Sequence, residues 1–139
     1  YATADTYPQN AVRGPIVMVT NQWAGSDGDI VAAATQAMGY AKVIGERSWG
    51  GVVGIDGRFD LVDGTSVTQP RYAGWYGSYG WGVENHGVDP DIVVTVSPED
   101  WEADCDVQLD AAIAECLRQL DDKPAATAPE LPGPAFDRC

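Results

Sequence analysis

The sequence predicts an α/β domain organised around a β-α-β unit, and three consecutive stretches support this prediction. Residues 15–20 form a short apolar run rich in β-branched side chains, which is typical of a buried strand. Residues 30–38 are rich in alanine and end before Gly39, as expected for a helix of about ten residues. Residues 41–45 form a second apolar run. Because these stretches follow one another closely, we expect two parallel strands joined by a right-handed crossover.

The turn at residues 21–29, between the first strand and the helix, carries a candidate nucleophile, Ser26. Sites in open α/β sheets lie at the carboxyl ends of the strands. A serine at this position would also lie beside unpaired N–H groups and the positive end of the helix dipole. These surroundings favour a nucleophile whose attack creates an oxyanion.

The turn allows two other interpretations. Ser26 and Asp29 have the spacing of a capping box, in which the serine simply caps the helix. The Asp27-Gly28-Asp29 run also invites a calcium interpretation, but apolar residues follow where an EF-type loop needs oxygen ligands. The sequence therefore predicts no calcium site, and the capping alternative stays open.

The middle of the chain predicts a small antiparallel β region. Residues 52–57, 59–64 and 66–68 alternate short strands with Asp-Gly turns. Residues 71–82 then interleave glycines with aromatic side chains and follow neither a helical nor a strand period. This stretch is either an aromatic wall beside a substrate cleft or a surface loop anchored by aromatic packing.

The last third of the chain predicts a strand within residues 88–96, a turn at 97–100 and an amphipathic helix at 105–121. Glu84 and His86 precede the strand. A glutamate there is most simply a surface residue, and His86, although chemically able to act as a base, is expected to be exposed. The division expected is a folded part at residues 1–123 and a Pro- and Ala-rich extended tail at 124–139.

Composition limits the classes of function. A net charge of −13 with only 8 Lys and Arg argues against nucleic-acid or membrane partners. No run approaches the roughly 18 apolar residues of a membrane span. The three cysteines show no disulfide framework, with Cys105 and Cys116 too far apart on the expected helix to bond, and this favours a cytoplasmic setting. One histidine cannot complete a zinc set, so no metal or cofactor is expected.

An ordered series of motifs resembles the C-terminal catalytic part of the tricorn protease family, which is related to the tail-specific serine peptidases. The resemblance covers about residues 7–121. The motifs are, in chain order, Arg13-Gly14-Pro15, Gly25-Ser26-Asp27-Gly28-Asp29, Ile44-Gly45-Glu46-Arg47-Ser48-Trp49-Gly50-Gly51-Val52-Val53-Gly54-Ile55, Leu61-Val62-Asp63-Gly64, Val83-Glu84-Asn85-His86-Gly87-Val88-Asp89-Pro90-Asp91-Ile92 and Asp106-Val107-Gln108-Leu109.

The resemblance implies a partial crotonase-like domain with a ββα/βαβ core, and a cytoplasmic peptidase that trims peptide substrates as a homo-oligomer. It implies a tetrad of two serines, a histidine and a glutamate. Ser26 matches the nucleophile, Glu84 matches the tetrad glutamate, and Asp27 matches the residue whose backbone N–H forms half of the oxyanion hole. The histidine, the second serine and the other oxyanion donor would belong to an upstream part of the same protein. His86 matches a variable position.

The sequence also indicates the type of catalytic base. Related peptidases with a Ser-Lys dyad carry a lysine after an aromatic-Gly pair, and this chain has Gly51 there, so it resembles the histidine-using type. Lys42 and Lys123 are not convincing substitutes. Because the chain begins at Tyr1 without a Met, we expect a fragment. Because the resemblance places the base for Ser26 in the upstream part, we expect this chain to be inert alone. Two alternatives stay open: a non-catalytic module that binds peptides or assembles a complex, and an acyl-transfer enzyme of the same fold, against which the Glu84 motif argues.

Overall fold

The computed structural model describes residue 8 and residues 10–127 of the 139-residue chain. Its central sheet has the order β1-β2-β5, with β1 at Val17–Thr20, β2 at Lys42–Gly45 and β5 at Ile92–Val93. Both pairings are parallel, and helix α1 (Asp27–Met38) connects β1 to β2. The predicted parallel β-α-β unit is therefore confirmed. The helix begins at Asp27, earlier than the sequence predicts.

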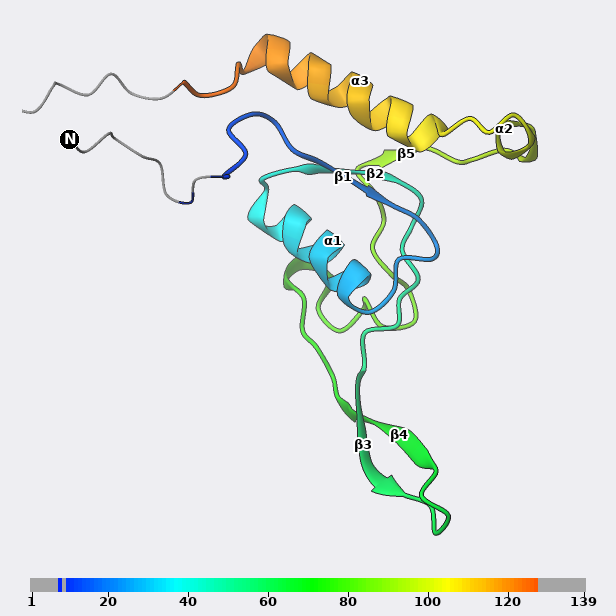
Figure 1. Cartoon of the computed structure of the whole chain (residues 1–139). Coiled ribbons are helices and arrows are strands. Elements are labelled where there is room, and N and C mark those ends of the chain that lie inside the picture. The colour runs from blue at the N-terminus through cyan, green and yellow to red at the C-terminus, as the bar shows by residue number, and fades with distance from the viewer. Residues whose placement is uncertain (1–7, 9, 128–139) are drawn as a thin grey trace, which may run out of the picture.

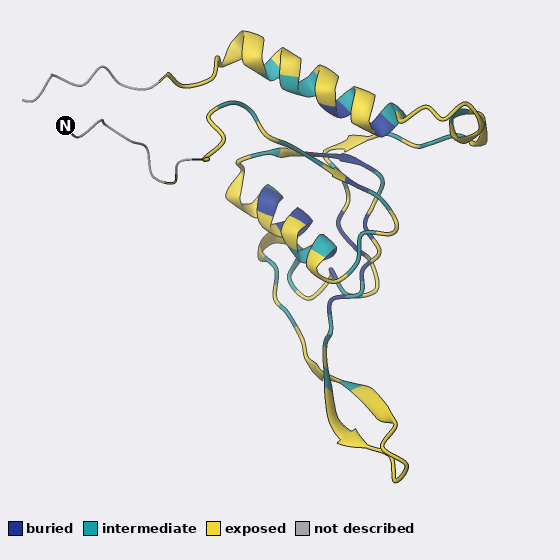
Figure 2. Ribbon diagram, in the orientation of Figure 1, coloured by how far each residue is buried: buried dark blue, intermediate teal, exposed yellow. Residues whose placement is uncertain are grey.

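Two helices enclose this small sheet, α1 on one side and α3 (Val107–Asp122) on the other (Figure 1). Val43 and Ile44 of β2 are completely buried between them. A second cluster of buried residues lies between α1 and the loops that follow β2 and β4 (Figure 2). Its members are Ala32, Ala33, Val52, Val83 and Val88.

The predicted antiparallel region is a single hairpin, formed by β3 (Gly54–Asp60) and β4 (Ser66–Tyr72), which projects away from the sheet (Figure 1). The turn at Asp63-Gly64 is confirmed, since Gly64 has a φ of 82°. The turn expected at Asp56-Gly57 is wrong, because both residues lie inside β3. There Asp56 pairs across the hairpin with Arg71 at 2.8 Å.

The predicted turn at 97–100 is instead the start of a short helix, α2 (Pro98–Glu102). Ser97 and Asp100 form a capping box in which each side chain accepts a hydrogen bond from the other residue's backbone N–H. Helix α3 begins later than expected because Asp106 caps it. Cys105 therefore lies between the helices, and both it and Cys116 are free thiols.

The strand expected within 88–96 is reduced to β5, which Pro90 precedes. Of the predicted tail, residues 124–127 form neither helix nor strand, and residues 128–139 lie outside the described part. Within the described part, no helix has the length and apolar character needed to cross a bilayer.

Helix α3 carries an acid-sensitive ion pair. Arg118 donates to both oxygens of Glu115 at 2.7 Å, and this contact, with a hydrogen bond from Gln119, lowers the pKa of Glu115 from 4.5 to about 2. A depressed folded-state pKa gives stability that is present above pH 4.5 and is lost as the pH falls towards 2. We expect the melting temperature of wild type to exceed that of Glu115→Gln above about pH 5 and the gap to close near pH 2. Glu102→Gln, which removes one charge from α2, is the control, and a gap independent of pH would contradict the prediction.

Candidate active site

The candidate site is built on the turn that joins β1 to α1. Asn21 starts the turn: its side chain accepts from Trp23 N–H at 3.0 Å and its carbonyl from Ala24 N–H at 2.9 Å. The carbonyl of Ala24 accepts in turn from Trp49 N–H at 2.9 Å, which ties the turn to the loop after β2. Ser26 is thus held just beyond the carboxyl end of the sheet, directly before the helix.

Ser26 adopts a backbone conformation that residues other than glycine rarely adopt. Its φ is 53° and its ψ is −111°, its side chain is exposed, and it makes no capping hydrogen bond to the helix. Such a conformation costs on the order of 1–3 kcal/mol and tends to occur at functional sites. A strained strand-to-helix turn is also how α/β hydrolases present a nucleophilic serine. The capping-box interpretation of Ser26 is therefore wrong.

Asp27 follows as the first residue of α1. Backbone N–H groups in the first turn of a helix have no acceptor within the helix, and they lie at the positive end of its dipole. The N–H of Asp27 is therefore suited to receive an anionic oxygen formed beside Ser26.

Glu84 is half-buried and fixed by the backbone, unlike a solvated surface glutamate. Its Oε2 accepts from the N–H groups of Val52 and Val53 at 2.8 and 2.7 Å. Among the described residues, no hydrogen bond is recorded for Oε1. The structure thus gives Glu84 a fixed direction and leaves one oxygen to bind another group.

Sequence reasoning missed the role of Asp29, which it took only as a capping partner of Ser26. Asp29 is completely buried and accepts from the Ser48 hydroxyl, from Gly50 N–H at 2.8 Å and from Gly51 N–H at 3.1 Å. The Gly50-Gly51 pair was the available signal, because two glycines in succession allow backbone N–H groups to approach a carboxylate closely.

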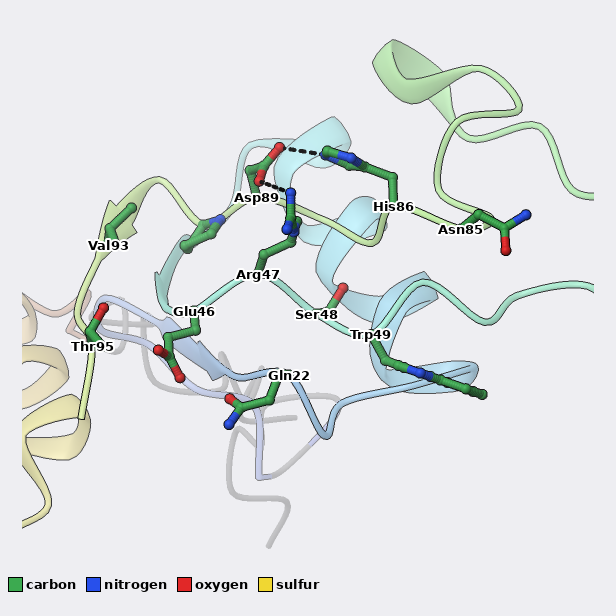
Figure 3. Close-up of a pocket in the computed structure, with 11 residues that line it drawn as sticks. Gln22, Glu46, Arg47, Ser48, Trp49, Asn85, His86, Asp89, Val93 and Thr95 are labelled. Atoms are coloured by element: carbon green, nitrogen blue, oxygen red, sulfur yellow. Dashed lines mark hydrogen bonds and ion pairs between the residues drawn. The ribbon is translucent and has the colours of Figure 1, made fainter. Parts of the chain in front are cut away.

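His86 lines a cavity of about 670 Å³ beside the loop after β2 (Figure 3). Its side chain is 45% exposed, and Nε2 lies 2.8 Å from Asp89 Oδ2. Arg47 approaches the same carboxylate at 4.0 Å. Ser26 does not line this cavity. The geometry therefore gives no support to His86 as the base for Ser26.

The two lysines considered as bases are also remote from the site. Lys42 pairs with Val17 in the register of the parallel sheet, which places it at the amino ends of the strands, whereas Ser26 follows the carboxyl end. Lys42 also forms an ion pair with Asp91 at 3.5 Å. Lys123 is the C-cap of α3.

The aromatic stretch at 71–82 is anchored by aromatic packing, as one of its two interpretations predicts, whereas its role as the wall of a substrate cleft stays a prediction. Tyr76 and Tyr79 pack against the buried cluster, and the Tyr79 hydroxyl donates to Gln36 of α1 at 2.9 Å. Burial raises the pKa of Tyr79. Trp75 and Trp81 stack edge to face at 5.4 Å and are both more than half exposed. Tyr76 and Tyr79 therefore anchor the loop, and the two tryptophans present an aromatic surface.

Comparisons with known proteins agree with this architecture. The model of peptidase family S41 matches residues 1–94. Tricorn protease homolog 1 of Streptomyces coelicolor is 59% identical over 91% of the chain, and the tricorn protease of Thermoplasma acidophilum is 48% identical over 85%. The chain spans 12% and 11% of the lengths of these two relatives.

Solved structures show the same relationship. The crystal structure of the tricorn protease superposes with a TM-score of 0.80 and 46% identity, covering 87% of this chain and 12% of that one. Mature CPAF superposes with a TM-score of 0.62 over 84% of this chain and 23% of its own, at 21% identity, and shares the fold. The mixed α/β fold expected from the sequence is therefore confirmed.

Proposed function

This chain belongs to peptidase family S41, and we propose that it carries the nucleophile of a tricorn-type serine peptidase whose histidine is supplied by an upstream part of the same protein. The observation that carries the proposal is the conformation of Ser26. A serine that is exposed, strained and free of any capping bond has no evident structural purpose at the start of α1.

The proposed reaction is hydrolysis of a peptide bond through an acyl-enzyme. Ser26 Oγ attacks the carbonyl carbon while the upstream histidine removes its proton, and the same histidine later protonates the leaving amine. The N–H of Asp27 stabilises the tetrahedral oxyanion, a contact whose loss typically costs about 100- to 1000-fold in rate. Water then releases the acyl group and regenerates Ser26.

In this proposal Glu84 supports the histidine through the second upstream serine. Its Oε2 is committed to Val52 and Val53, which leaves Oε1 to accept from the second upstream serine. That serine would then hold the imidazole in the orientation needed to accept a proton from Ser26. Cytoplasmic location, peptide trimming and homo-oligomerisation complete the proposal, as the resemblance to tricorn proteases implies.

Covalent labelling of the full-length protein tests this function. We expect a fluorophosphonate to modify Ser26, as located by peptide mass spectrometry, and Ser26→Ala to abolish the adduct. The 139-residue chain by itself should take up no label, because it carries no base for Ser26. A folded full-length protein without an adduct would instead favour a non-catalytic peptide-binding module, and labelling of the isolated chain would contradict the upstream histidine.

A further inference from the structure

Asp29 is a completely buried acid that no lysine or arginine of the described part pairs with. Three donors surround it instead. Ser48 Oγ and Gly50 N–H both donate to Oδ1, and Gly51 N–H donates to Oδ2 at 3.1 Å. Burying an acid is unfavourable unless its oxygens are hydrogen-bonded, so this arrangement depends on the three donors remaining in place.

All three donors belong to the loop between β2 and β3. The same loop also forms hydrogen bonds to the side chain of Glu84, which follows β4 in the chain. Immediately after Gly51, the N–H groups of Val52 and Val53 bind the Glu84 carboxylate. The carbonyl of Gly50 accepts from Asn85 N–H at 2.8 Å. One short segment of backbone therefore connects Asp29 to Glu84 and to the residue that follows it.

Glu84 lies in a turn at residues 83–87, in which the N–H groups of His86 and Gly87 donate to the Val83 carbonyl; we call it the Glu84 turn. Ser48 extends the connection to Val88, at the far end of this turn. Its hydroxyl donates to Asp29 and accepts from Val88 N–H at 2.8 Å, while its own N–H donates to the Val88 carbonyl at 3.1 Å. The hydrogen bonds that start from Asp29 therefore fix the Glu84 turn at two points, at Asn85 next to Glu84 and at Val88 after the turn.

On the premise of the proposed function, we propose that Asp29 is a positioning residue that sets the place of Glu84 relative to Ser26. Ser26 and Asp29 are fixed to each other because they flank the first turn of α1. Asp29 then fixes the loop, and the loop fixes Glu84. Displacements of about 1 Å in catalytic groups can reduce rates about 100-fold, so such a clamp matters for turnover without touching the substrate.

A purely structural role for Asp29 makes a different prediction. It would lower the stability of the protein, but the molecules that remain folded would turn over substrate at the normal rate. A positioning role lowers kcat in the folded protein and leaves KM nearly unchanged, since ground-state binding does not depend on the histidine side of the site. If Asp29 acts by positioning Glu84, the effect of substituting Asp29 on kcat should also disappear once the Glu84 carboxylate has been removed.

Asp29→Asn in the full-length protein is the direct test. Asparagine keeps the shape and two acceptor contacts but places an amide N–H against the N–H of Gly51. We expect a folded protein whose kcat falls about 10- to 100-fold while KM stays within about twofold. In a Glu84→Gln background, the same substitution should lower kcat by less than about threefold more.

Two further variants keep the test decisive. Ser48→Ala removes the hydroxyl between Asp29 and Val88 and should lower kcat in the same direction, so it decides the matter if Asp29→Asn does not fold. Asp91→Asn is the matched control, because Asp91 also accepts one backbone N–H, from Val43 at 2.8 Å, but lies at the opposite end of the sheet. Its kcat should equal that of wild type.

The outcomes separate this inference from the function on which it rests. If wild type is active and Ser26→Ala is not, the proposed function stands. Two results would then overturn the positioning role alone. One is a folded Asp29→Asn variant with the wild-type kcat. The other is an Asp29→Asn substitution that lowers kcat by the same factor in the Glu84→Gln background as in wild type. If the folded wild type neither turns over peptides nor reacts at Ser26, the proposed function itself fails.

Discussion

Replacing Ser26 with alanine in the full-length protein is expected to lower kcat by at least about 10⁴-fold, because Ser26 is the nucleophile that forms the acyl-enzyme in the proposed mechanism. The free energy of unfolding should change by less than about 0.5 kcal/mol, since the side chain is exposed and makes no capping bond. Steady-state hydrolysis of a fluorogenic peptide and chemical denaturation measure the two quantities. Residual activity near the wild-type level would remove Ser26 from the mechanism.

Two companion substitutions separate strain from capping. Ser26→Gly should raise the free energy of unfolding by about 1 kcal/mol, because glycine accepts a φ of 53° and a ψ of −111° without strain, while activity is lost. Ser97→Ala removes a true helix cap and should lower stability by about 1 kcal/mol while activity is kept. If Ser26→Gly instead destabilises the protein, the turn holds no strain and the structural case for a nucleophile is lost.

The sequence predicted those parts of the fold that depend on local pattern. The apolar runs at 15–20 and 41–45 and the alanine-rich stretch between them each indicate their own conformation, and a short crossover requires the strands to be parallel. The same reasoning failed at Asp56-Gly57, because an Asp-Gly pair is compatible with a turn but does not require one. In the structure Asp56 instead pairs with Gln69 in the register of the hairpin and forms an ion pair with Arg71 of the opposite strand.

The candidate site shows the same limit more sharply. Ser26 could be singled out because its surroundings are set by the strand before it and the helix after it. The partners of Glu84 could not, because its oxygen meets backbone N–H groups that are 31 and 32 residues away. Asp29 was misassigned for the same reason: a local rule paired it with Ser26, whereas its partners come from the loop after β2. The Gly50-Gly51 pair indicates that backbone N–H groups can approach a carboxylate there, but only the folded chain shows that the carboxylate is Asp29.

Gly87→Ala should be among the most damaging single substitutions in this chain. Gly87 has a φ of 88°, and a Cβ at this position would overlap the carbonyl oxygen of Ser48. The positive φ and the Ser48 carbonyl oxygen are both features of the backbone, which cannot move aside as a flexible side chain can. We expect a loss of about 4 kcal/mol or more in the free energy of unfolding, together with loss of peptidase activity, because separating Ser48 from Val88 displaces the turn that carries Glu84.

Gly64→Ala is the control that isolates the close approach from the backbone conformation. Gly64 has a similar φ of 82°, but it lies at the tip of the hairpin with no atom within 4 Å of the added Cβ. Gly64→Ala should therefore lower the free energy of unfolding only by the strain of an alanine at positive φ, about 1 kcal/mol, and should keep full activity. Equal losses for the two variants would mean that the loop after β2 and the Glu84 turn are not packed together. Glu84 would then lack a fixed place relative to Ser26, and the proposed tetrad would lose its structural support.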